Sequence, residues 1–227
     1  MNFNADLTTR AVVYTPNQPW VNSPLIGVTR RALERIGGES AEWATTIVRY
    51  AAGSHFSHHV HDRGEEILVL DGSFSDHSGE FPVGMYVRNP PGSQHRPFST
   101  DGCTILVKLR QFAVDDNQFL RLDTHKSHWQ SGDLPGQQTL PLFSRNSEHV
   151  ELQRWTAKTR LKPHVHPMGE EIYVIEGELT DEHGNYPAGT WLRQPAGSSH
   201  TPVSHAGCTL YVKTDHLPLT TNNPGAH

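Results

Sequence analysis

The sequence predicts an all-β protein built from two similar domains, and three observations lead to this prediction. Shifting the 227-residue chain by 105 positions matches residues 59–108 to residues 164–213 without insertion or deletion. A repeat of this length exceeds a solenoid unit and fits one small domain. Within each copy, short runs of apolar, β-branched and aromatic residues alternate with turn-forming residues. Many short strands at even spacing are typical of a β-sandwich or small barrel.

The expected strands follow in order along the chain. In the first copy they are ATTIVRY, EILVL, MYV and TILVKL, at 44–50, 66–70, 85–87 and 104–109. In the second copy they are VELQRW, EIYVI, TWL and TLYVK, at 150–155, 171–175, 190–192 and 209–213. Residues 27–38, GVTRRALERIGG, could form a short helix, and an arm or a strand is equally plausible.

The repeat sets the expected domain organisation. We expect an N-terminal arm and two domains followed by a C-terminal tail, with bounds at residues 1–19, 20–112, 113–215 and 216–227. Each domain is long enough to bury a core of its own.

Composition excludes several classes of protein. The formal net charge is −5 and no Lys/Arg-rich run is present, which argues against binding to nucleic-acid phosphates. No stretch approaches the roughly 20 apolar residues that span a membrane, and residues 1–20 lack the apolar core of a signal peptide. Two cysteines, Cys103 and Cys208, do not indicate a disulfide framework. We therefore expect a soluble cytoplasmic protein.

Histidine is the unusual feature of the composition, with 16 residues. Because side chains alternate along a strand, His59, His61 and Glu65 can share one face. His95 follows a Gly- and Pro-rich turn that can fold its strand back onto the same place. The repeat gives a second such set, made of His164, His166, Glu170 and His200.

Three imidazoles and one carboxylate around an open position predict a divalent-metal site in each domain. Imidazole suits Zn, Cu, Fe and Ni, and a carboxylate extends the choice to Mn. A cation would pair polar groups that are otherwise costly to bury at the start of an apolar strand. The alternative is that these histidines are solvated or satisfied by hydrogen bonds.

These residues resemble the two sequence motifs of the cupin family. The motif G-x5-H-x-H-x3-4-E-x6-G runs from Gly53 to Gly72, and its second copy ends at Gly177 with Lys158 in place of the leading glycine. The motif G-x5-P-x-G-x2-H begins at Gly84 and at Gly189, and both copies lack the asparagine that follows it in the family. The resemblance implies two tandem cupin domains, each a double-stranded β-helix or jelly-roll barrel.

The chain is more specifically similar to ChrR-type cupins. The segments GEEILVLDGSFSDHSGEFPVGMYVRNPPGSQH and GEEIYVIEGELTDEHGNYPAGTWLRQPAGSSH both match that bacterial group. In that family the equivalent His, His, Glu and His bind zinc in the cupin domain of an anti-sigma factor. The resemblance makes Zn²⁺ the first metal to expect at both sites, with Fe²⁺, Mn²⁺ and Ni²⁺ as alternatives. The family's sigma-factor inhibition resides in a separate helical zinc domain. Because no histidine precedes His55 and no cysteine precedes Cys103, we expect neither that domain nor direct sigma-factor inhibition.

Two functions remain open from the sequence. The first is a zinc-binding regulatory or sensor protein that responds to a small-molecule ligand or oxidant. The second is a metal-dependent enzyme of the dioxygenase type, acting on a small enolisable or dicarbonyl substrate through Lewis-acid polarisation. By resemblance to other cupins, we also expect a homodimer.

Other repeated residues have a structural and a functional interpretation. We expect Cys103 and Cys208 to be buried in the core, and the alternative is a redox-sensing thiol near the metal. Glu66 and Glu171 should face away from the ligand glutamates, as outer-face charges or in turn hydrogen bonds, and the alternative is that they support a metal ligand from outside. Arg88 and Arg193 should form salt bridges, or else orient an acidic ligand.

Overall fold

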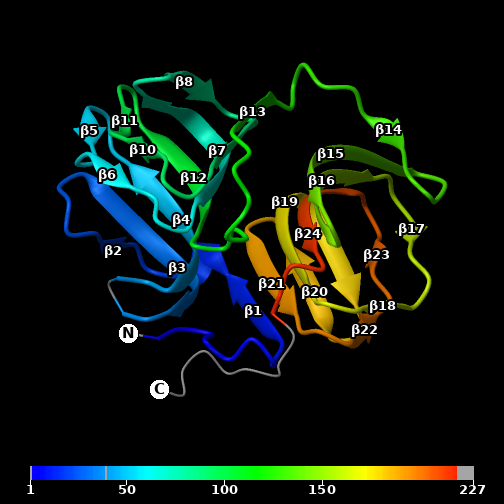
Figure 1. Cartoon of the computed structure of the whole chain (residues 1–227). Coiled ribbons are helices and arrows are strands. Elements are labelled where there is room, and N and C mark those ends of the chain that lie inside the picture. The colour runs from blue at the N-terminus through cyan, green and yellow to red at the C-terminus, as the bar shows by residue number, and fades with distance from the viewer. Residues whose placement is uncertain (1, 39, 219–227) are drawn as a thin grey trace. The chain divides into compact units, whose positions relative to one another are not determined.

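The computed structural model describes residues 2–38 and 40–218 and confirms the all-β prediction (Figure 1). The described residues form β-strands and one 3-10 helix, η1 (Thr15–Asn17). The ambiguous segment 27–38 contains a strand, β3 (Val28–Ile36). Most of the expected C-terminal tail lies outside the described residues.

No helix among the described residues has the length and apolar composition needed to cross a bilayer.

The described chain divides into two compact units, which we call barrel 1 and barrel 2. Barrel 1 contains residues 2–5 and 18–127, and barrel 2 contains residues 6–17 and 128–218. Each has a large antiparallel sheet and a separate two-stranded sheet.

Barrel 1 is built around one ten-stranded sheet. Its main path runs through β13 (Leu120–Asp123), β9 (Met85–Asn89), β7 (Glu65–Asp76), β12 (Cys103–Leu109), β4 (Trp43–Tyr50), β3 and β2 (Val21–Asn22). Three further strands join this sheet: β5 (Ser54–His55), β8 (Gly79–Pro82) and β11 (Phe98–Ser99). The two-stranded sheet pairs β6 (His59–Val60) with β10 (Gln94–His95).

Barrel 2 repeats this arrangement strand for strand. Its main path runs through β1 (Ala11–Tyr14), β21 (Thr190–Gln194), β19 (Glu170–Asp181), β24 (Cys208–Thr214), β16 (Glu148–Trp155), β15 (Gln137–Arg145) and β14 (Gln130–Ser131). The further strands are β17 (Thr159–Arg160), β20 (Gly184–Pro187) and β23 (Val203–Ser204). The two-stranded sheet pairs β18 (His164–His166) with β22 (Ser198–His200).

Each barrel is extended by the strand that precedes the other barrel in the chain. Strand β1, in the N-terminal segment, pairs with β21 of barrel 2. Strand β13, which follows the first repeat, pairs with β9 of barrel 1. Because β9 and β21 are equivalent in the repeat, the two segments have exchanged places. Residues 6–17 thus lie in barrel 2 and residues 113–127 in barrel 1.

The interior of each barrel is filled by alternate residues of its strands. In barrel 1, Ile67 and Val69 of β7 pack with Ile105 and Val107 of β12, and all four are buried. Ile172, Val174, Leu210 and Val212 do the same in barrel 2. Removing these apolar side chains from water is the main source of barrel stability.

The two cysteines belong to these cores. Cys103 is 3% exposed and Cys208 is 7% exposed. Burial raises the pKa of Cys103 to about 11 and also raises the pKa of Cys208. Because the thiolate is the reactive form, both thiols have the properties of small core hydrophobes.

The glutamates that follow the predicted ligands are buried among polar partners, so the expectation of a charge on the outer face was wrong. Glu66 forms an ion pair with Arg88, whose second terminal nitrogen lies 2.5 Å from Asp116. Glu171 accepts hydrogen bonds from Trp191 at 2.9 Å and from His216 at 2.8 Å. The salt-bridge interpretation of Arg88 is therefore confirmed.

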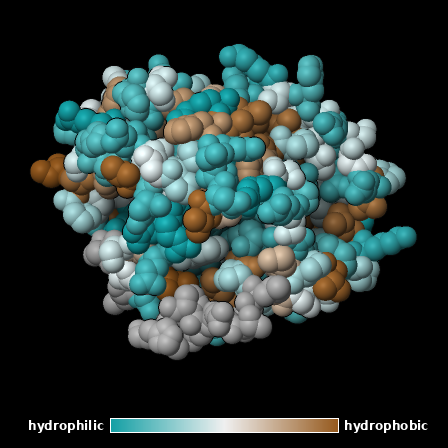
Figure 2. All heavy atoms as spheres, in the orientation of Figure 1, coloured by the Kyte–Doolittle hydropathy of each residue, from teal (hydrophilic) through white to brown (hydrophobic). Residues whose placement is uncertain are grey.

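The exposed side chains are mostly hydrophilic on the face seen in Figure 2, where hydrophobic residues lie in small groups among them. Exposed large hydrophobic residues are distributed through both barrels, and include Ile26, Val60, Val114 and Val165. Scattered exposure of this kind is normal for a folded protein.

Candidate metal centres

The predicted ligands of barrel 1 come together through the pairing of β6 with β10. This pairing places His59 directly opposite His95. His61 follows β6, and its main chain is held by hydrogen bonds with Ser93 and Gly92 at 2.8 and 2.7 Å. Glu65 begins β7, after Gly64 has turned the chain with a φ of 77°. A side chain at Gly64 would meet the ring of Phe112 at 2.4 Å, so only glycine fits this turn.

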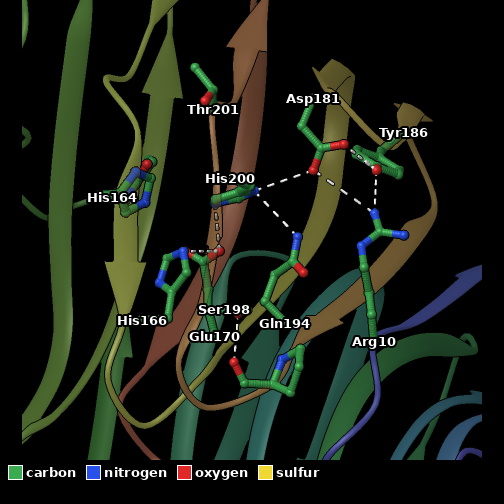
Figure 3. A network of polar contacts seen from close by, with 12 residues as sticks. Arg10, His164, His166, Glu170, Asp181, Tyr186, Gln194, Ser198, His200 and Thr201 are labelled. Carbon is green, nitrogen blue, oxygen red and sulfur yellow. Dashed lines mark hydrogen bonds and ion pairs between the residues drawn. The ribbon is translucent and has the colours of Figure 1, made fainter.

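Barrel 2 assembles its ligands in the same way. Strand β18 pairs with β22 so that His164 lies opposite His200, and Glu170 begins β19. Figure 3 shows His164, His166, Glu170 and His200 gathered between these strands. The structure therefore brings together all eight residues predicted from the sequence, in two groups of four.

The spacing of the donor atoms is suited to a single ion in each group. Within each group, one donor atom per residue can be chosen so that all four lie within 4.8 Å of one another. In barrel 1, Nε2 of His61 and Nε2 of His95 each lie 3.4 Å from the same oxygen of Glu65. In barrel 2 the corresponding distances to Glu170 are 3.4 and 3.3 Å.

Several of these converging atoms are buried without a hydrogen-bond partner among the described residues. They are Nε2 of His61, His95, His166 and His200, and Oε2 of Glu170. A buried polar atom without a partner costs free energy, and native proteins rarely leave several together. One divalent cation in each barrel would give the unpartnered atoms of that barrel a partner, so the residues present fit a metal ion in each barrel.

His59 and His164 are the partly exposed histidines of the two clusters, and a contact of their Nδ1 atoms fixes the orientation of each ring. Nδ1 of His59 lies 2.8 Å from the carbonyl oxygen of Ser57, and Nδ1 of His164 lies 2.9 Å from that of Lys162. Because a carbonyl only accepts, Nδ1 carries the proton in the neutral ring and Nε2 is left as a lone-pair donor.

A buried aspartate orients the ring of His95 in barrel 1 and that of His200 in barrel 2. Nδ1 of His95 lies 3.0 Å from Asp76, and Nδ1 of His200 lies 3.3 Å from Asp181. Metal-binding histidines commonly have such a carboxylate partner, which orients the ring and makes its other nitrogen more basic. The equivalent aspartates occur in both repeats, which is a signal that the sequence analysis did not use.

Burial and charge shift the pKa values of these groups in opposite directions. Burial lowers the pKa of His61 and of His166, which favours the neutral rings that bind metals. Burial also acts to lower the pKa of His95, but the hydrogen bond to Asp76 outweighs it and the pKa is raised. Burial acts to raise the pKa of Glu65, but the neighbouring charges of His61 and His95 lower it overall.

The exchanged strand β13 supports the centre of barrel 1. Asn89 donates a hydrogen bond of 3.0 Å to Glu65, and Arg121 of β13 donates one of 2.7 Å to Asn89. This chain holds the glutamate in place from outside the ligand set. Neither Asn89 nor Arg121 was predicted. Asn89 contacts Glu65 through the pairing of β9 with β7, and the role of Arg121 depends on the strand exchange.

Barrel 2 supports its centre with a different set of contacts (Figure 3). Gln194 replaces Asn89 and lies 3.4 Å from Nδ1 of His200. Tyr186 donates a hydrogen bond of 2.5 Å to Asp181, and Arg10 donates one to Tyr186. Burial acts to raise the pKa of Asp181, but hydrogen bonds from His200 and Tyr186 lower it to about 2. Arg10 lies beside β1, so the exchanged segment again reaches the outer contacts of a centre.

We expect Asp76→Ala to weaken metal binding by barrel 1 by about 10- to 100-fold, because His95 loses the partner that orients it. Competition with a chromophoric zinc chelator would measure this affinity. Asp71→Ala is the matched control, since Asp71 lies on the same strand and is exposed. An unchanged affinity in Asp76→Ala would show that the aspartate has no part in holding the ligand.

Comparison with known proteins agrees with this geometry. The family model of the ChrR cupin-like domain matches the chain twice, over residues 8–113 and 117–218. No curated protein matches the sequence.

Three solved structures illustrate the similarity of the fold. A putative glyoxylate-induced protein from Pseudomonas aeruginosa has a TM-score of 0.75 at 16% identity, over 98% of this chain and 94% of that one. A putative dioxygenase from Nostoc punctiforme has a TM-score of 0.71 at 15% identity, over 97% and 85%. An oxalate decarboxylase from Lactobacillus farciminis, in a formate complex, has a TM-score of 0.65 at 12% identity, over 91% and 86%.

At these identities the solved structures establish the fold alone. The family match, by contrast, covers most of the chain and includes all eight clustered residues. The chain belongs to the ChrR cupin-like family and carries two copies of its domain in tandem.

Proposed function

We propose that this protein binds one divalent metal ion in each barrel and acts as a zinc-dependent regulatory or sensor protein for a small-molecule ligand. The observation that carries the proposal is the pair of clusters in which three imidazoles and one carboxylate converge. Imidazole and carboxylate donors suit zinc, and the family resemblance supports zinc as the first metal to test.

The surroundings of the first cluster support a role in ligand binding. A cavity of about 420 Å³ in barrel 1 is lined by His59, His61 and Glu65 together with apolar side chains. This volume lies in the range of small-molecule sites. When bound, a divalent metal would supply an open position for a ligand oxygen. The chain's own residues would hold the cation and exclude water from the apolar wall.

The same cavity supports a second candidate function, that of a metal-dependent enzyme of the dioxygenase type with Fe, Mn or Ni. A pocket that reaches the ligand set could admit a small enolisable or dicarbonyl substrate. Similarity of fold to a putative dioxygenase and to oxalate decarboxylases is consistent with this candidate. Glu65, held by Asn89, would be the group able to exchange a proton if it left the metal.

Elemental analysis of protein purified without added metal tests the proposal. We expect two ions per chain in the unaltered protein, one in His61→Ala or His166→Ala, and none in the double variant. His58→Ala, which alters an exposed histidine outside both clusters, should keep two. Unchanged stoichiometry in the cluster variants would refute the assignment.

The identity of the metal separates the two functions. Zinc supports the sensor, and iron, manganese or nickel with oxygen uptake supports the enzyme. The homodimer, the cytoplasmic location and the lack of a sigma-factor or nucleic-acid partner stay predictions.

A further inference from the structure

The cavity of barrel 1 has an apolar wall that leads to the metal-binding cluster. Strands β3, β4 and β12 contribute Val28, Val48, Ile105 and Val107 to this wall. The strand register places these side chains in rows that run across the sheet toward β7. A ligand that fills the cavity therefore needs an apolar body.

Two buried residues of the cavity lining, Thr46 and Tyr50, carry hydroxyl groups. Thr46 is 4% exposed, and its Oγ1 has no hydrogen-bond partner among the described residues. Thr46 lies opposite Val107 on the neighbouring strand, and Val107 lies opposite Ile67. Ile67 is the next inward-facing residue after Glu65, so Thr46 lies one row of side chains away from Glu65. A buried hydroxyl facing a cavity is best satisfied by a polar atom of the ligand.

The repeat shows that barrel 2 has polar side chains in part of this wall, although Leu210 and Val212 keep the positions of Ile105 and Val107 apolar. Val28 pairs with Tyr50, and Gln137 pairs with Trp155, the counterpart of Tyr50 in the repeat. Val28 and Gln137 are therefore equivalent. The 105-residue shift makes Thr46 equivalent to Glu151, and Val48 equivalent to Gln153. Three apolar or small positions of barrel 1 are thus a glutamate and two glutamines in barrel 2.

These polar side chains bind one another. Gln153 donates a hydrogen bond of 2.6 Å to Glu151 and accepts bonds from Gln137 at 3.3 Å and Trp155 at 2.8 Å. The space that an apolar ligand body would occupy in barrel 1 is therefore crossed by a hydrogen-bonded chain in barrel 2. An apolar ligand there would have to break it and leave polar groups unpaired.

The charged groups near the two clusters also favour barrel 1 over barrel 2 as the site of a ligand. A divalent cation with three neutral imidazoles and one carboxylate has a net charge of about +1, which favours an anionic ligand. Arg30 and Arg35 line the cavity of barrel 1 and add to this preference. The carboxylate of Asp62 also lines the cavity, but it forms an ion pair with Arg110. In barrel 2, Glu151 brings a second carboxyl group that interacts electrostatically with Glu170 and opposes an incoming anion when ionised.

We propose that barrel 1, rather than barrel 2, is the ligand-binding barrel, and that its ligand is a small organic carboxylate with an apolar body. The proposal rests on the proposed function, because it requires a cation at the His59 cluster. The anionic group binds beside this cluster, the apolar body contacts Val28, Val48 and Ile105, and Thr46 donates a hydrogen bond to a ligand oxygen. Thr46 and Val48 determine which barrel binds.

Calorimetric titration of zinc-loaded protein tests this inference, with benzoate and hexanoate as probes and benzamide and hexanamide as their neutral matches. We expect one carboxylate per chain, bound at least about tenfold more tightly than the amide. The double variant Thr46→Glu, Val48→Gln copies barrel 2 and should abolish binding. Thr46→Val keeps the shape of the side chain and should weaken binding by roughly 2- to 10-fold.

The matched control makes the reverse change in barrel 2. Glu151→Thr with Gln153→Val should leave the titration at barrel 1 unaltered. The proposal is overturned if metal-loaded protein binds neither carboxylate, if the amides bind equally well, or if only the barrel 2 variant loses binding. Metal content is measured on the same samples, so protein that holds no zinc counts against the proposed function instead.

Discussion

Gly72→Ala lowers the free energy of unfolding by roughly 3 kcal/mol or more, because the substitution combines backbone strain with a backbone clash. Gly72 has a φ of 68°, in the left-handed region that side chains disfavour. A Cβ atom there would lie 2.1 Å from the carbonyl oxygen of Gly102, which belongs to a neighbouring main chain and cannot rotate away. Urea denaturation followed by circular dichroism would measure the loss.

Gly53→Ala is the matched control for this substitution. Gly53 has a similar φ of 73°, but a Cβ atom there meets nothing within 4 Å. We expect a cost of only about 1 kcal/mol, from the conformation alone. Equal losses in the two variants would show that the conformation decides stability and that the close approach to Gly102 does not.

The repeated motif can be detected from the sequence, but the structure is needed to explain which of its glycines are required. Barrel 2 keeps the tight glycine as Gly177, whose Cβ would also lie 2.1 Å from a carbonyl oxygen. It carries Lys158 in place of Gly53, and Lys158 has a φ of 67°. The position of Gly53 therefore tolerates a side chain, whereas that of Gly72 does not.

The missing motif asparagine has a similar explanation. Ser99 and Ser204 take its place, and their hydroxyls donate hydrogen bonds of 2.6 and 2.7 Å to the carbonyl oxygens of Ser73 and Glu178. The departure from the family pattern is a substitution that still ties two strands together. Its partners lie 26 residues away along the chain in each case, so their identity required the fold.

The exchange of β1 and β13 could not be predicted from the sequence. The repeat register runs from His59 to Lys108 and contains neither strand. Both are short, and nothing in their residues specifies which sheet edge they join. The consequence for the site is direct, since Arg121 and Arg10 reach the outer contacts of the two centres from these segments. The ligand sets were recognisable because the repeat and the motif spacing mark them. The expectation that one strand carries them was wrong, since His59 lies on β6, Glu65 begins β7 and His95 lies on β10.

Removing the metal with a chelator lowers the free energy of unfolding by about 4 kcal/mol for each site that had been loaded at 1,000 times its dissociation constant. For chains of this size, such a loss corresponds to a fall in melting temperature on the order of 10 °C. The structural reason is the set of buried Nε2 atoms without hydrogen-bond partners among the described residues. The four donors of each cluster converge only in the folded barrel, so the cation binds the folded state and its removal destabilises that state.

The double variant His61→Ala, His166→Ala separates this effect from any direct action of the chelator. It lacks one ligand in each cluster, so its melting temperature should be the same with and without chelator. A melting temperature of the unaltered protein that stays constant while elemental analysis shows the metal gone would contradict the prediction. The contacts of His95 with Asp76 and of Glu65 with Asn89 would then be sufficient to hold the clusters without a cation.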